Sequence, residues 1–219
     1  LAAALEDARP GDRLLIAALG QGVDVVALQV TDKIDKLGER RGVKGSLARS
    51  TPLGSYEKYV SFRELLDVDK GIRGEIEAAT ALTAMWRYRN EVLGLVGGKC
   101  TACGTVQFPR QRTCVNPECH ATDESEPVRL SDRMGTVFTF TGDHLSFTMV
   151  PPQIYGTVDV DGGGRLFIDF TDCTLEDLKV GDAVEMTLRR KYHDQTRGLS
   201  GYFWKATPAS DAGEEADHA

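Results

Sequence analysis

The chain has 219 residues, of which 41% are hydrophobic and 27% are charged, and its formal net charge is −7. This length allows one large or two small domains, and the composition is ordinary for a soluble globular protein. The negative charge argues against non-specific nucleic-acid binding, which needs a basic face, and no apolar run approaches the ~20 residues that span a bilayer.

The N-terminal segment predicts a fragment of an α/β domain. Leu1–Ala8 suits the end of a helix, and Pro10-Gly11-Asp12 suits a turn. Leu14–Leu19 and Val23–Val30 are nearly unbroken apolar runs joined at Gly20-Gln21-Gly22, and such runs predict strands that are apolar on both faces. Because two strands and part of a helix cannot cover both faces, we expect the rest of this domain upstream or on another polypeptide.

The next segment indicates a linker followed by two helices. Residues 33–55 are basic and poor in apolar side chains, which favours a solvated linker; a basic strap along an anionic ligand or partner is the alternative. Helices are predicted over Tyr56–Val68 and over about 72–90. The apolar stripe of the second helix consists of Ile72, Ile76, Ala79, Leu82 and Trp86. This stripe must dock on its own small domain or on a partner.

Four cysteines within twenty residues form the strongest chemical signal: Cys100, Cys103, Cys114 and Cys119. Two close thiolate pairs suit one tetrahedral metal ion, and a four-thiolate site leaves no open coordination position for a substrate. The second pair is wider than usual, so His120 is the alternative to Cys119 as fourth ligand. We favour zinc over iron, because iron would be redox-active with no evident electron partner. The expected role of the metal ion is structural: it would hold a short β ribbon together.

The cysteine count also bears on the cellular compartment. An odd number of cysteines, with four of them in one cluster, fits a reducing compartment, and we expect the cytoplasm. Cys173 is left over, and we expect it to be a small buried or half-buried side chain and not a nucleophile.

The C-terminal half has an all-β pattern. Five strands are predicted: Gly135–His144, Ile154–Val160, Arg165–Phe170, Ala183–Lys191 and Tyr202–Lys205. A glycine turn follows the second strand, and a short turn of helix within 175–182 precedes the fourth. This order suits a small oligonucleotide/oligosaccharide-binding (OB) barrel. Core packing is favoured over ligand contact for Phe138, Phe140, Tyr155 and Phe167. The acidic tail is expected to be disordered.

Together these segments resemble the domain of unknown function 35 family. The resemblance rests on KCTACGTVQFPRQRTC, GTVFTFT, PPQIYGTVDVDGGGRLFIDFTD and LKVGDAVEM, and it covers about 72–208. It implies N-terminal helices, a rubredoxin-like zinc ribbon and a C-terminal OB-fold, and therefore an α+β chain that is mainly β. The wider second cysteine pair departs from the family pattern.

The N-terminal segment has a resemblance of its own. ALEDARPGDRLLIAALGQGVDVVALQVTD is similar to the C-terminal hairpin of the thiolase superfamily, especially the hydroxymethylglutaryl-CoA synthase and ketoacyl synthase III types. SYEKYVSFRELL is similar to the synthase type. In that superfamily the nucleophilic cysteine and its partners lie upstream of the hairpin, so no catalytic residue maps onto this chain.

The two resemblances imply an accessory module that binds acyl-CoA and a thiolase-like or hydroxymethylglutaryl-CoA synthase-like catalytic domain, fused or separate. We expect a hetero-oligomeric synthase, acyltransferase or aldolase assembly, with structural zinc, a coenzyme A thioester as ligand and no membrane association. The cations placed to meet CoA phosphates are Arg89, Lys99, Arg110 and Arg112; solvated surface charges or ion-pair partners are the alternative. A zinc-ribbon and OB protein that binds single-stranded nucleic acid is the alternative function, and a free-standing enzyme ranks last.

We expect six segments along the chain. They are a thiolase-like C-terminal piece (1–32), a linker with one helix (33–71), a helical lead-in (72–98), the zinc ribbon (99–125), the OB-fold (126–208) and the acidic tail (209–219).

Overall fold

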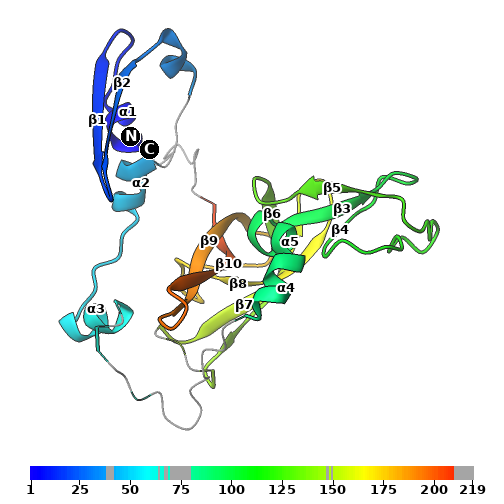
Figure 1. Ribbon diagram of the computed structural model, residues 1–219. Helices are drawn as coiled ribbons and strands as arrows, with labels where there is room; N and C mark the ends of the chain where they lie inside the picture. Colours follow the sequence, from blue (N-terminus) through cyan, green and yellow to red (C-terminus); the bar gives the residue numbers. More distant parts are fainter. Residues whose placement is uncertain are drawn as a thin grey trace, which may run out of the picture. The chain divides into compact units, whose positions relative to one another are not determined.

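The computed structural model describes residues 1–37, 42–63, 65–66, 69, 80–146, 148 and 150–209. These residues fall into two compact units, one within 1–67 and one within 68–209 (Figure 1). The first unit holds the N-terminal hairpin, and the second holds the cysteine ribbon and a β-barrel. Among the described helices, none is long and apolar enough to cross a membrane.

The N-terminal unit is built around one antiparallel hairpin. Helix α1 (Ala2–Glu6) leads into β1 (Arg13–Leu19) and β2 (Val23–Gln29), which pair along their whole length. Gly11 adopts a φ of 92° in the turn before β1, and its amide donates to the Val30 carbonyl at 2.9 Å. The predicted turn and both predicted strands are confirmed.

The segment predicted as an extended linker is partly helical. It contains the 3-10 helix η1 (Asp32–Lys36) and the α-helix α2 (Gly42–Ala48). The Glu6 carboxylate on α1 accepts hydrogen bonds from the amides of Val43 and Lys44, which are unpaired donors at the start of α2. A contact between residues far apart in the sequence therefore stabilises a helix that local composition does not reveal.

Helix α3 (Tyr56–Phe62) begins where predicted and ends well before Val68. Ser55 caps its start, because the Ser55 hydroxyl accepts a hydrogen bond from the Lys58 amide at 3.1 Å. Leu66 lies beyond the helix. The predicted length is therefore wrong, although the predicted start is right.

The predicted second helix is interrupted. Residues 72–79, which carry the first half of its apolar stripe, lie outside the described residues. The rest forms α4 (Leu82–Arg87) and α5 (Arg89–Gly94), which break at Tyr88, where φ is −105° and ψ is 19°. The Arg89 side chain on α5 donates a hydrogen bond to the Trp86 carbonyl in the last turn of α4. This hydrogen bond takes the place of one from a helical amide. The prediction of a single uninterrupted helix is therefore wrong.

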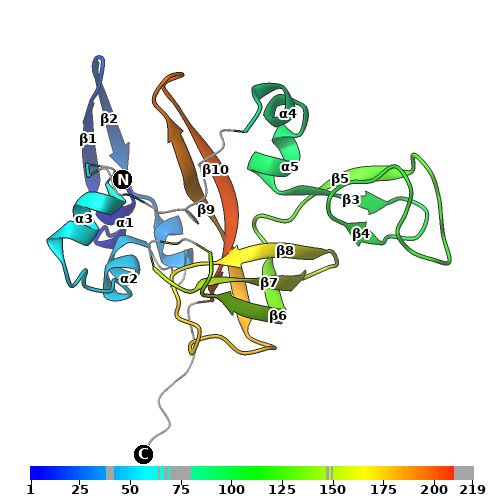
Figure 2. The ribbon, with the colours of Figure 1, turned by 90° about the horizontal axis from the view of Figure 1, so that it is seen from below.

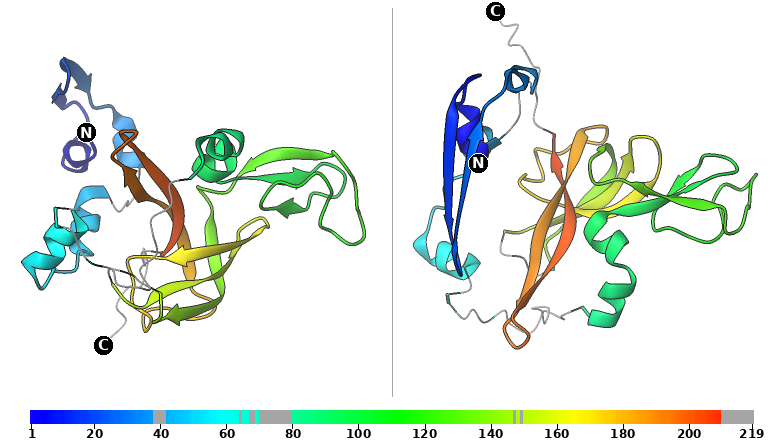
Figure 3. Two further views of the ribbon diagram at one scale, coloured as in Figure 1. Left: turned by 60° about the horizontal axis from the view of Figure 1, so that its bottom comes forward. Right: turned by 45° about the horizontal axis from the view of Figure 1, so that its top comes forward.

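Five strands close into a barrel: β6 (Met134–Asp143), β7 (Gln153–Val160), β8 (Arg165–Phe170), β9 (Ala183–Asp194) and β10 (Leu199–Pro208). Their order is β10-β8-β7-β6-β9, with β10 and β8 parallel and the other pairs antiparallel (Figure 2). Figure 3 shows the β9–β10 hairpin reaching past the other strands. The predicted OB barrel is confirmed. Residues 175–182 form turns and not the predicted turn of helix, since Asp177 accepts the Thr174 amide at 2.7 Å and closes a local loop.

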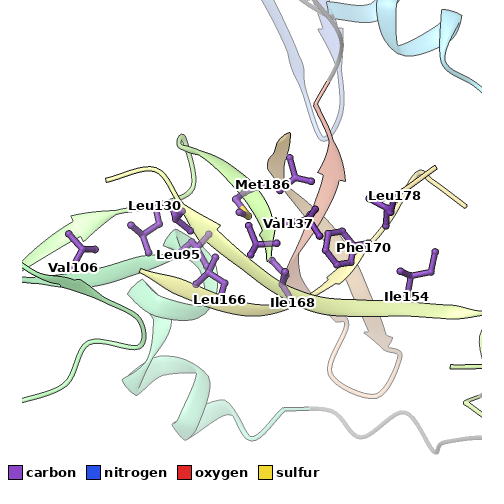
Figure 4. Packing of buried hydrophobic residues seen from close by; sticks show 14 residues of the cluster. Leu95, Val106, Leu130, Val137, Ile154, Leu166, Ile168, Phe170, Leu178 and Met186 are labelled. Carbon is purple, nitrogen blue, oxygen red and sulfur yellow. The ribbon is translucent and has the colours of Figure 1, made fainter. Parts of the chain in front are cut away.

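The cysteine ribbon and the barrel share one hydrophobic core (Figure 4). Val158 and Val184 are fully buried inside the barrel. Leu95 and Val106, on the ribbon side, belong to the same cluster. In the glycine turn after β7, a Cβ added to Gly163 would lie 3.1 Å from the Val106 side chain, so the turn itself packs on the ribbon. Packing therefore fixes the ribbon against the barrel.

The barrel aromatics divide between the two faces of the barrel wall. Phe140 packs against the core, with its ring centroid 6.4 Å from that of Phe170. Phe138 and Phe167 are 48% and 75% exposed, so the expected core role is wrong for both. A β-bulge after Val137 shifts the strand alternation, so Phe138 and Phe140 face opposite sides although they are two residues apart.

Candidate metal centre

The ribbon sheet presents the first cysteine pair. It consists of β3 (Val96–Cys100), β4 (Val106–Gln107) and β5 (Ser125–Arg129) in the antiparallel order β4-β3-β5. The Gly104 amide donates to the Cys100 carbonyl at 2.8 Å, and Gly104 has a φ of 77°. This left-handed residue closes the tight turn that runs from Cys100 through Cys103.

The wider second pair closes through a longer turn. The Asn116 carbonyl accepts the amides of Cys119 and His120 at 3.0 and 3.3 Å, and the Asn116 side chain accepts the Glu118 amide at 3.0 Å. The Cys114 amide donates to the Ala121 carbonyl at 2.9 Å, which ties the two ends of the turn together. The two extra residues are therefore accommodated without moving the last cysteine away from the site.

The four cysteine sulfurs converge on one point. They all lie within 4.8 Å of one another, with Cys100 and Cys119 3.9 Å apart and Cys103 and Cys114 3.6 Å apart. A tetrahedral zinc with Zn–S bonds of about 2.3 Å needs sulfur separations of about 3.8 Å. The residues therefore fit a structural zinc ion. Among the described residues the cluster contains Cys119 and not His120.

The electrostatics of the cluster also require a cation. Hydrogen bonds from the Thr105 hydroxyl and amide lower the pKa of Cys103 to about 6. A backbone hydrogen bond from Asn116 favours the Cys114 thiolate, but burial and the neighbouring thiols outweigh it and raise the pKa of Cys114 to about 12. Four thiolates at these distances repel one another, so they are all deprotonated together only around a metal ion.

A buried glutamine holds the loop that carries the second pair. The Gln107 side-chain amide donates to the carbonyls of Gln111 and Thr113 at 3.4 and 3.3 Å, and its oxygen accepts the Val115 amide at 3.0 Å. Gln107 is one of the few buried polar residues. The sequence does not predict this role, because a single glutamine between Val106 and Phe108 carries no signal of what it contacts.

The four cations proposed for CoA phosphates all have protein partners. Arg112 forms a bidentate pair with an aspartate at 2.7 and 2.8 Å, and Lys99 lies 3.8 Å from a glutamate oxygen. Arg110 donates to a backbone carbonyl of β5, and Arg89 donates to the Trp86 carbonyl at 2.7 Å. Phosphate binding by any of them stays a prediction, and for Lys99 and Arg112 it would require exchange of a carboxylate.

An open groove of about 600 Å³ runs along α4. Its lining is mainly apolar and consists of Leu82, Thr83, Trp86, Arg87 and Arg89. The Arg89 guanidinium lies 4.3 Å from the Trp86 ring centroid, and the Trp86 side chain is 71% exposed. An exposed indole with two guanidinium groups suits a ligand or partner that is partly apolar and anionic.

Cys173 lies apart from the metal cluster. It is half-buried against the barrel core, as expected. Burial raises the pKa of its thiol to about 11, with nearby Asp177 and Asp172 acting in the same direction. A thiol that stays protonated at neutral pH is a poor nucleophile.

Comparison with known proteins agrees with this architecture. Residues 93–125 match the rubredoxin-like zinc ribbon domain of ChsH2, and residues 127–189 match the C-terminal OB-fold domain of ChsH2. The first match covers all four metal-site cysteines, and the second covers most of the barrel.

Similarity extends to whole relatives. A DUF35 domain-containing scaffold protein of Methanocaldococcus jannaschii is 32% identical over 126 residues, which cover 56% of this chain and 87% of the relative. A protein of the same description from Pyrococcus furiosus is 30% identical over 126 residues, covering 56% and 89%. Among solved structures, the Ltp2-ChsH2(DUF35) aldolase aligns with a TM-score of 0.44 at 17% identity, covering 61% of this chain and 98% of the other.

Proposed function

The chain belongs to the DUF35 family, and from this premise we propose that it is an accessory scaffold module of a thiolase-type enzyme that acts on acyl-CoA. The observation that carries the proposal is the convergence of four cysteine sulfurs. A zinc ion held by all four sulfurs would have a complete tetrahedral shell with no position left for a substrate, so it would stabilise the ribbon and would not bind a reacting group. Both relatives named above are described as scaffold proteins, which agrees with such a role.

The catalytic residues are assigned to the partner. The similarity of the N-terminal segment to the thiolase-superfamily hairpin supports a thiolase-like or hydroxymethylglutaryl-CoA synthase-like domain, fused or separate, within a hetero-oligomer. The reaction would then be a condensation, a cleavage or an acyl transfer of a CoA thioester. The cytoplasm is the proposed compartment, because none of the five cysteines, all of them among the described residues, forms a disulfide.

The groove along α4 is the proposed contact for acyl-CoA. Its apolar lining suits the pantetheine arm, and Arg87 and Arg89 provide cations for the phosphates. Arg89 and Arg110 donate to backbone carbonyls, whereas Lys99 and Arg112 are paired with carboxylates. The first two therefore keep a charge that an anion can use, and Arg89 is the first candidate for mutation.

Calorimetric titration of the zinc-loaded full chain with acetyl-CoA tests the ligand. Arg89→Gln and Trp86→Ala should each weaken binding at least about tenfold, or about 1.4 kcal/mol. Arg197→Gln, which removes an exposed arginine from the β9–β10 turn, should leave it unchanged. Co-expression with a thiolase-type enzyme should yield one complex in gel filtration. The proposal would be wrong if the chain does not bind acetyl-CoA and elutes separately from the enzyme.

One observation favours a second candidate function, the binding of single-stranded nucleic acid. On the outer face of the barrel, the exposed Phe167 ring meets the half-buried Tyr155 ring edge to face at a centroid distance of 5.7 Å, and exposed rings can stack bases. Arg165 on the same face is neutralised by Asp159 at 2.6 Å, so phosphates gain little from it. This function therefore ranks second. Salt-dependent binding of oligothymidine that Phe167→Ala abolishes would reverse the order.

A further inference from the structure

The N-terminal hairpin exposes apolar side chains on both of its faces. Directly opposite residues of antiparallel strands share a face, so the register separates two sets. The A face carries Leu15, Leu19, Val23 and Val25, which are 72%, 86%, 62% and 58% exposed. The B face carries Leu14, Ile16, Val26 and Leu28. Leu14 and Ile16 are half-buried, but Val26 and Leu28 are still 50% and 38% exposed.

The two edges of the hairpin are open as well. Among the described residues, β1 and β2 pair only with each other. Arg13 and Asp24 are the only charged residues in the two strands, so the charges that usually protect an exposed edge are nearly absent. A two-stranded hairpin is marginally stable by itself in water. This element therefore lacks a cover for both faces and a neighbour for its edges.

We infer that the β1–β2 hairpin is the end of a larger sheet supplied by an α/β protein, whose helical layers cover both hairpin faces. Strands that are apolar on both sides belong to sheets with helices on each face. A second copy of this chain, seated on the A face, would leave Val26, Leu28 and the edges exposed. A small apolar ligand would leave the edge amides unpaired. An α/β domain satisfies both faces and the edges at once.

This inference deepens the proposed function, on which the identification of the partner as a thiolase-type enzyme rests. The burial and pairing of the hairpin residues alone indicate an α/β cover. An α/β partner with an unrelated activity would therefore uphold the inference and refute the proposed function. A thiolase-type partner that leaves the hairpin uncovered would do the reverse.

Site-specific photo-crosslinking tests the inference. The photoreactive residue p-benzoylphenylalanine replaces Val25 on the A face or Val26 on the B face of the full natural protein, in the cells that produce it. Val180, which is 67% exposed on a barrel loop, is the matched control. Zinc content checks that the second unit of each variant folds. Both hairpin positions should crosslink to helices of the same α/β domain, at least about fivefold more than Val180, with the contact peptides identified by mass spectrometry.

Several outcomes would overturn the inference. Crosslinks from Val25 to the same position of a second copy would make the A face a dimer interface. Crosslinks at Val25 with none at Val26 would mean that only one face is covered. Crosslinks to a protein without an α/β fold, or no crosslinks above the Val180 level, would remove the proposed partner.

Discussion

Replacing Gln107 by methionine should weaken zinc binding, although Gln107 is not a metal ligand. Its side chain makes two long hydrogen bonds, at 3.3 and 3.4 Å, and one of ordinary length at 3.0 Å. With about 0.5 kcal/mol for each long bond and about 0.5–1.5 kcal/mol for the third, their loss costs about 1.5–2.5 kcal/mol. Because metal binding and folding of this loop are coupled, the cost corresponds to about 10- to 70-fold in zinc affinity.

The assay is competition for zinc between the protein and a chromogenic chelator at fixed pH. Methionine has nearly the length of glutamine, so the substitution removes hydrogen bonds with little change of volume. Gln111→Met is the matched control, because the Gln111 side chain is exposed and only its backbone carbonyl contacts Gln107. Equal affinities for Gln107→Met and the wild type, or equal losses in both variants, would show that the Gln107 hydrogen bonds do not support zinc binding.

Three further outcomes are expected. Cys119→Ser should lower zinc affinity more than about 100-fold, whereas His120→Ala should leave it unchanged in the same competition assay; the opposite pattern would make His120 the ligand. Leu166→Ala should cost about 2–5 kcal/mol in urea unfolding, while its neighbour Phe167→Ala should cost at most about 1 kcal/mol, since Leu166 is buried and Phe167 is exposed. Removing zinc with a chelator should lower the thermal midpoint of the barrel itself, because the ribbon and the barrel share a core; an unchanged barrel transition would contradict that coupling.

The metal centre was predictable because its information is local. Two residues separate Cys100 from Cys103, and Gly104 follows where the turn needs a left-handed residue. The second pair raised an ambiguity between Cys119 and His120 that spacing alone did not resolve. The Asn116 turn brings the Cys119 sulfur into the cluster, which favours Cys119 as the fourth ligand.

The orientation of the barrel aromatics was not predictable in the same way. Phe138 and Phe140 are two residues apart, and strict alternation would place them on one face. The bulge in β6 breaks that alternation. It fits because Gly156 lies opposite Phe140, where a Cβ would collide with the Thr139 carbonyl. The bulge thus depends on a residue from the neighbouring strand.

Local sequence patterns were sufficient to predict the elements whose signals repeat over a few residues: the cysteine turns, the five barrel strands, and two N-terminal strands that are apolar on both faces. The contacts that join distant segments became known only from the folded structure. Glu6 supports the start of α2, Gln107 holds the metal loop, and Gly163 packs on Val106 so that the ribbon and the barrel share one core. The physical reason is that periodicity and ligand spacing act along the chain. Capping, buried hydrogen bonds and packing instead depend on which side chains meet after folding.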